Sequence, residues 1–142
     1  PVKPSVEGLD DLIKDIEKRQ VAEKLLPLLP WGWHEEIIYF TQNEFTNRIM
    51  LDGVPTEVSE EELNGKYNVD RHGYKAVDGR MLKGCDHLAA FVEAYLSTEY
   101  GITSKHLLNG MADLREKYKN KTIAGINFGA VYDEFPELKT NL

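Results

Sequence analysis

The sequence predicts an all-α fold, a helical bundle over a chain of 142 residues. Three observations predict it. Apolar residues recur at the three- and four-residue spacing of helices, helix-capping residues separate these segments, and no segment alternates strictly as a half-buried strand does. Hydrophobic residues make up 42% of the chain, which is enough for a core. We therefore expect residues 1–142 to form a single all-helical domain or a fragment of one.

The N-terminal part is expected to hold two helices, over residues 7–26 and 33–49. Apolar side chains such as Leu12 and Ile16 recur at helical spacing in the first helix, and charged residues occupy its other side. Ser5 is the expected N-cap of this helix. Aromatic and aliphatic side chains supply the apolar contacts of the second helix.

The middle of the chain, residues 51–77, has the weakest pattern. An Asp-Gly pair at residues 52–53 indicates a turn. Ser59 and Glu62 have the spacing of a capping box, which predicts a short helix. Residues 68–74 are polar and are expected to form a loop.

Three further helices are expected in the C-terminal part. The longest has Asp78 as its N-cap and runs to about Tyr100. It is apolar nearly all round, which predicts a buried central helix. The other two helices are expected over about 104–119 and 126–135.

The composition excludes several classes of function. A net charge of -7 and a pI near 5.1 argue against binding a nucleic acid polymer by charge attraction. No apolar run approaches the roughly 20 residues that cross a bilayer, and no leader peptide is recognisable. The one cysteine, Cys85, permits no internal disulfide and is predicted to be a core thiol. We expect a cytoplasmic protein that does not bind membranes.

Asp86 is the most informative residue, because it is a carboxylate within the predicted buried helix. An ionised carboxylate in such a place must be paired or bound to a metal. Two interpretations are open: a metal ligand, or a structural group that caps a helix or pairs with Arg80 or Arg115. Spacing alone favours the structural role. Glu93 lies two turns further along and projects to about the same side, with a buried pair as its own structural alternative.

The sequence lacks the spacing of a self-contained metal site. Four histidines are scattered along the chain: His34, His72, His87 and His106. None has the spacing of paired zinc ligands, and none is followed by Asp. His87 neighbours Asp86 but points about 100° away around the helix, so it is expected to be a partly buried polar residue.

Residues 83–94 (KGCDHLAAFVEA) resemble the late helix of the HD-domain metal-dependent phosphohydrolases, and most closely the bacterial 5′-deoxyribonucleotidase-like group. In that family a K-x-x-D-x-L-like pattern supplies the last aspartate ligand, and this role falls on Asp86. The opening Pro-Val-Lys resembles the T-P-V-K segment that follows the family's His-Asp pair. The resemblance implies that Lys3 approaches the substrate phosphate, unless it is simply an exposed lysine, and that Glu93 acts beside the metal or in the substrate pocket.

The family's first His, its His-Asp pair and its catalytic Glu precede the T-P-V-K segment and have no counterpart here. The resemblance therefore implies the C-terminal part of an HD-type domain, inactive alone, whose other ligands lie in a missing N-terminal segment. The implied activity is hydrolysis of a nucleoside monophosphate with a divalent metal ion (Mn, Co, Mg, Zn or Fe), in a homo-oligomer such as a dimer. The alternative is a catalytically inactive helical module that binds a partner through an exposed apolar face.

Overall fold

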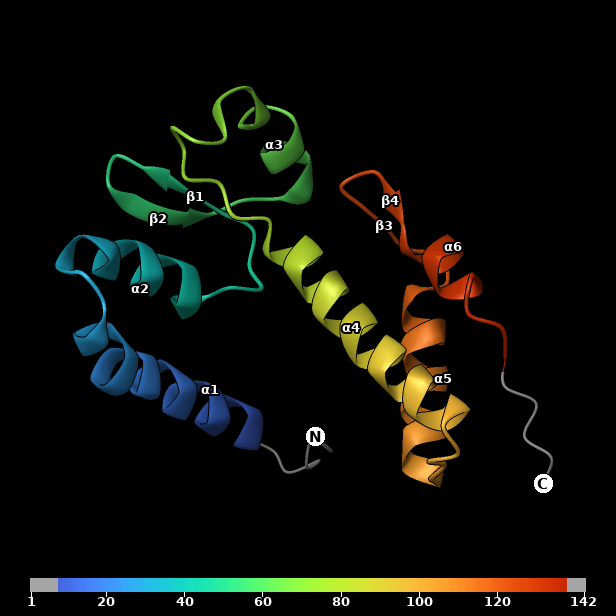
Figure 1. The fold of residues 1–142 in the computed structure, drawn as a ribbon. Helices are drawn as coiled ribbons and strands as arrows, with labels where there is room; N and C mark the ends of the chain where they lie inside the picture. Colours follow the sequence, from blue (N-terminus) through green and yellow to red (C-terminus); the bar gives the residue numbers. More distant parts are fainter. Residues whose placement is uncertain (1–7, 138–142) are drawn as a thin grey trace. The chain divides into compact units, whose positions relative to one another are not determined.

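The computed structural model describes residues 8–137, and its chain divides into two compact units. The N-terminal unit is Pro1–Glu44 and the C-terminal unit is Phe45–Leu142. Figure 1 draws the elements of both units in the colours of the sequence. The expected N-cap Ser5 and the candidate residue Lys3 lie outside the described residues.

The N-terminal unit is helical throughout its regular structure. Helix α1 (Leu9–Gln20) continues directly into a π-helical turn (Val21–Leu25) and a 3₁₀ turn (Leu26–Leu28), so the helix predicted over 7–26 is regular α-helix only as far as Gln20. A second 3₁₀ turn (Trp31–Trp33) leads into helix α2 (His34–Gln42), which ends earlier than predicted. Leu26 is the one buried hydrophobic residue among the described residues of this unit.

The C-terminal unit begins with a β-hairpin where the sequence predicted the end of a helix and a turn. Strands β1 (Arg48–Leu51) and β2 (Val54–Glu57) pair antiparallel. The turn residues Asp52 and Gly53 both have positive φ, 49° and 78°, which is typical of the tight turns that join two strands. The prediction that the chain has no strand is therefore wrong here, because the Asp-Gly pair closes a hairpin.

Helix α3 (Glu60–Asn64) comes after the hairpin and begins with the predicted capping box. Ser59 Oγ accepts a hydrogen bond from the Glu62 backbone N–H at 3.1 Å, and the Glu62 carboxylate accepts one from the Ser59 N–H at 2.9 Å. These hydrogen bonds, the backbone one first, lower the pKa of Glu62. A small core of Ile49, Leu63 and Tyr67 holds α3 and the hairpin together. A 3₁₀ turn (Asn68–Asp70) lies in the predicted polar loop.

Three helices and a second hairpin complete the unit. Their bounds are α4 (Gly79–Glu99), α5 (Lys105–Tyr118), β3 (Thr122–Ile123), β4 (Ile126–Asn127) and α6 (Phe128–Asp133). The predicted N-caps are confirmed, since the Asp78 carboxylate accepts from Met81 N–H and Ser104 Oγ accepts from Leu107 N–H.

The main core lies between α4, α5 and α6 and is largely aromatic. Its buried members are Phe91, Tyr95, Met111, Tyr118, Ile123, Phe128 and Tyr132. Arg115 on α5 fastens the end of α6, because its guanidinium donates to the carbonyls of Tyr132 at 2.7 Å and Phe135 at 2.5 Å. The same guanidinium lies over the Phe91 ring, 4.7 Å from its centre.

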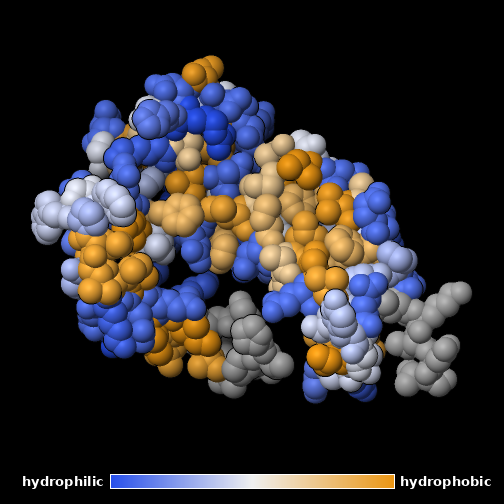
Figure 2. All heavy atoms as spheres, viewed as in Figure 1, coloured by the Kyte–Doolittle hydropathy of each residue, from blue (hydrophilic) through white to orange (hydrophobic). Residues whose placement is uncertain are grey.

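The all-α class is confirmed, since the described residues form six α-helices and only two short two-stranded sheets. Within residues 8–137 no helix is long and apolar enough to cross a membrane. Hydrophobic side chains also reach the surface, along α1 and α2 in the N-terminal unit and along α4 in the C-terminal unit (Figure 2).

Replacing Gly84 tests the packing of α4 against α6. A Cβ on Gly84 would lie 2.7 Å from the Phe128 ring, which is itself buried and cannot swing aside. We expect Gly84→Ala to lower the free energy of unfolding by about 1–3 kcal/mol through overpacking. Urea unfolding followed by circular dichroism measures the change.

The matched control is Gly110→Ala on α5, where an added Cβ meets nothing within 4 Å. This change should stabilise the protein by about 0.5–1 kcal/mol, because alanine is the better helix former. Equal stabilisation by both substitutions would contradict the close contact between Gly84 and Phe128.

Candidate functional site

Asp86 lies on the exposed side of α4, and the prediction that it is buried is wrong. Its side chain is 55% exposed. The core contacts of α4 run through Phe91 and Tyr95, which lie about 140° and about 180° around the helix from Asp86 at roughly 100° per residue. The predicted core thiol Cys85 is exposed as well.

Asp86 pairs with a neighbour on its own helix. Lys83 Nζ lies 3.1 Å from Asp86 Oδ2, and the same ammonium lies over the Phe45 ring, 4.1 Å from its centre. An exposed ion pair between residues three apart contributes little stability. The Asp86 carboxylate is therefore accessible to a stronger cationic partner.

The two arginines that offered a structural role for Asp86 bind elsewhere. Arg80 Nη1 lies 3.8 Å from Glu60 Oε2, and Arg115 holds the carbonyls at the end of α6. The interpretation that Asp86 neutralises one of these guanidiniums is therefore wrong. The exposed position also removes the reason for expecting a structural partner.

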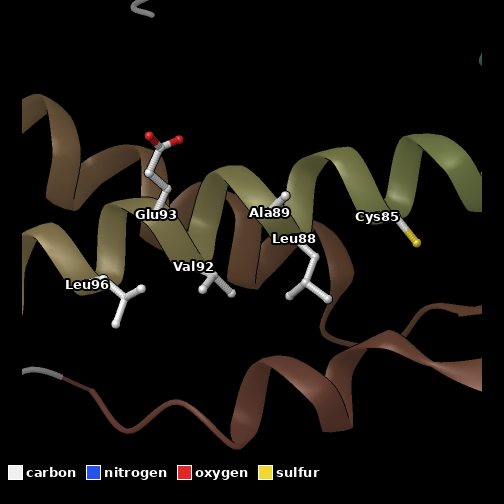
Figure 3. A pocket seen from close by; sticks show the side chains of 6 residues that line it. All are labelled: Cys85, Leu88, Ala89, Val92, Glu93 and Leu96. Carbon is white, nitrogen blue, oxygen red and sulfur yellow. The ribbon is translucent and has the colours of Figure 1, made fainter.

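An open apolar groove of about 510 Å³ runs along the same helix. Figure 3 shows that Leu88, Val92 and Leu96 point to one side of α4, whereas the Glu93 carboxylate projects to the other. The lining residues are Cys85, Leu88, Ala89, Val92, Glu93 and Leu96. Glu93 is exposed and makes no ion pair with the described residues, so its predicted alternative, a buried pair, is wrong.

The described residues do not form a complete metal site by themselves. Among residues 8–137 there is no group of three or more His, Cys, Asp or Glu side chains placed to hold an ion. The Asp86 carboxylate is nevertheless an accessible oxygen donor of the kind that Mg²⁺ and Mn²⁺ prefer. Asp86 thus fits one ligand position of such an ion.

His87, the residue next to Asp86, turns inward and is only partly buried, as predicted. Its Nδ1 lies 2.7 Å from the hydroxyl of Tyr118 on α5, and the two rings meet edge to face, 5.7 Å apart. Tyr118 is 3% exposed. Burial raises the pKa of Tyr118, and the charges of Asp86 and Cys85 raise it further.

Sequence reasoning did not find Tyr118, because 31 residues separate it from His87 and no motif contains it.

Of the other histidines, His34 in the N-terminal unit contacts its local backbone, with Nε2 at 3.1 Å from the Leu29 carbonyl. The structure therefore brings Asp86 together with Lys83 and places His87 against Tyr118. It leaves Glu93 at the groove, two helical turns from Asp86.

One family model matches most of the chain. It is described as an HD domain and covers residues 3–115, which include α4 with Asp86 and Glu93. None of the curated proteins or solved structures compared with the chain matches it significantly.

The buried Tyr132 should make the protein less stable at alkaline pH. Burial, and then the neighbouring Tyr118, raise the pKa of Tyr132 to about 12. An unfolded tyrosine ionises near pH 10, so between about pH 10 and about pH 12 the unfolded state loses protons that the folded state keeps. We expect the ionisation of Tyr132 to have no effect on the free energy of unfolding below about pH 10. Above about pH 10 the free energy of unfolding should fall as the pH rises.

Urea unfolding across this range measures the effect. Tyr132→Phe should make the alkaline fall of stability shallower, while Tyr100→Phe, at a side chain that is 86% exposed, should leave it unchanged. An identical fall in the wild type and in Tyr132→Phe would contradict the raised pKa of Tyr132.

Proposed function

The chain belongs to the HD domain family, and we propose that it is part of a divalent-metal-dependent phosphohydrolase. Members of this family are generally metal-dependent hydrolases. In this proposal Asp86 is a metal ligand. The observation that carries the proposal is the accessible Asp86 carboxylate on α4, inside the matched region and paired with a lysine of its own helix. The family match does not favour the alternative, an inactive partner-binding module.

The role of Asp86 follows from its chemistry. A divalent ion, when bound, activates a water molecule and neutralises phosphate charge. Asp86 supplies a negatively charged oxygen ligand, and the rigid α4 fixes its direction. Lys83, released from Asp86, would remain within reach of a bound anion such as the substrate phosphate.

The other ligands would come from a segment outside the described residues. We propose an N-terminal segment carrying the family's His and His-Asp ligands, so that residues 1–142 alone are inactive. The lack of a three-ligand cluster within residues 8–137 supports this proposal. We also propose that residues 1–142 belong to one domain, because the match over 3–115 runs across the boundary between the two units.

A nucleoside monophosphate is the proposed substrate. The groove on α4 is apolar and its volume of about 510 Å³ is in the range of small-molecule sites, which suits a base and sugar. Glu93, whose carboxylate is turned away from Leu88, Val92 and Leu96, would accept a hydrogen bond from a sugar hydroxyl that lies beyond the apolar lining. Lys3 would approach the phosphate. We further propose that the protein forms a homo-oligomer and is cytoplasmic.

Replacing Asp86 tests the ligand assignment. In the full-length protein, Asp86→Ala should lower Mn²⁺-dependent phosphatase activity by at least about 100-fold, because an ion that loses a ligand is bound and oriented poorly. Its free energy of unfolding should change by less than about 1 kcal/mol, since the Lys83 pair is exposed. Phosphate release and urea unfolding measure the two effects.

Asp113→Ala, which removes an exposed carboxylate on α5, is the matched control and should retain full activity. Undiminished turnover by Asp86→Ala would refute the assignment. Metal-dependent hydrolysis by residues 1–142 alone would refute the proposal that a further segment completes the site.

Replacing Glu93 tests its role toward the substrate. Glu93→Ala should raise KM for a nucleoside monophosphate about tenfold and leave kcat nearly unchanged, because one hydrogen bond that the substrate and the transition state share equally is lost. Steady-state kinetics with a nucleotide and with a simple aryl phosphate measure the change. An equal rise in KM for both substrates would contradict a contact with the nucleoside.

A further inference from the structure

We propose that Tyr118 is a positioning residue, whose hydroxyl fixes the rotation of α4 through His87 and so directs Asp86 outward. This inference rests on the proposed role of Asp86 as a metal ligand. It concerns a residue of α5 that lies beyond the family match, which ends at residue 115. The positioning would therefore be supplied by this chain's own C-terminal elements.

Tyr118 is held firmly enough to act as a fixed point. Its ring is stacked on Tyr132 at 5.5 Å with only 9° between the planes, and the Phe128 ring also lies 5.5 Å away. All three side chains are nearly inaccessible to solvent. The Tyr118 hydroxyl therefore presents a hydrogen-bonding group at a defined place beside α4.

Two contacts from this aromatic cluster flank Asp86 on its helix. Gly84 lies against Phe128, so closely that a Cβ there would be 2.7 Å from the ring. His87 Nδ1 lies 2.7 Å from Tyr118 Oη. Gly84 and His87 are three residues apart, on one side of α4, and Asp86 lies between them in sequence. The segment that carries Asp86 is thus anchored immediately before and immediately after it.

The rotation of α4 matters because Asp86 extends far from the helix axis. A side-chain tip lies about 5–6 Å from the axis, so a rotation of about 10° moves it by about 1 Å. Metal ligands need to be held within about 0.5 Å of their working geometry. The aromatic packing sets which side of α4 faces the core, and the hydrogen bond between His87 and Tyr118 adds a directional contact one residue after Asp86.

The test measures Mn²⁺ affinity in the full-length protein by electron paramagnetic resonance, with thermal unfolding as a check on the fold. Tyr118→Phe keeps the ring and removes the hydroxyl, and we expect it to raise the Kd for Mn²⁺ about tenfold, as the loss of supporting hydrogen bonds at metal sites does. Tyr132→Phe is the matched control, because its buried hydroxyl has no hydrogen-bond partner among the described residues. It should leave the Kd unchanged.

A double-mutant cycle separates positioning from a general effect on stability. His87→Ala should raise the Kd as Tyr118→Phe does, and the double variant should lose no more than either single variant, because both remove the same bond. Additive losses, or equal losses in Tyr118→Phe and Tyr132→Phe, would overturn the proposal. If Tyr118→Phe does not fold, the Kd of His87→Ala for Mn²⁺ is compared with that of Tyr132→Phe instead. Equal values would then overturn the proposal.

Asp86→Ala distinguishes failure of this inference from failure of the proposed function. Loss of Mn²⁺ binding in Asp86→Ala together with wild-type affinity in Tyr118→Phe and His87→Ala would overturn only the positioning role. Wild-type affinity in Asp86→Ala would overturn the ligand assignment, and the positioning inference with it.

Discussion

The packing of one side of α4 against a cluster of aromatic rings is the interaction on which the C-terminal unit depends. Phe91 is fully buried and meets the rings of Tyr132 at 4.8 Å and Phe135 at 5.5 Å, both edge to face. Such rings bury large areas and prefer defined angles, so they fix neighbouring helices more closely than aliphatic contacts do. The place of every other residue on α4, including Asp86, depends on which side of the helix this cluster occupies.

Local signals in the sequence predicted the helices well. The N-caps Asp78 and Ser104 and the capping box of Ser59 and Glu62 are where the spacing placed them, because a cap depends only on residues three apart. The two hairpins were missed. Both contain a pair with positive φ, Asp52-Gly53 and Ala124-Gly125, and strands this short show no alternation that sequence reasoning can detect.

The surroundings of the candidate site residues were predicted only in part, because burial is a tertiary property. A helix that is apolar nearly all round has the capacity to be buried on every side, and the sequence cannot say which sides are covered. Asp86 and Cys85 were expected in the interior and lie on the exposed side instead. Likewise His87 was correctly expected to be partly buried, but its contact with Tyr118 depends on how α5 packs against α4, which no local pattern encodes.

Arg115 is the last residue of the family match and also joins the matched region to the C-terminal helix α6. Its guanidinium donates to backbone carbonyls near the end of α6, which follow it in the sequence. The flat face of the same guanidinium covers the ring of Phe91, which precedes it in the sequence. Sequence similarity therefore stops in the middle of a cooperative folding unit. Cleavage just after this arginine would remove Tyr118, Phe128 and Tyr132, three of the five buried rings of the aromatic cluster. The boundary of the resemblance is therefore not a boundary of the fold, and any shortened version of this chain needs to extend through Phe135.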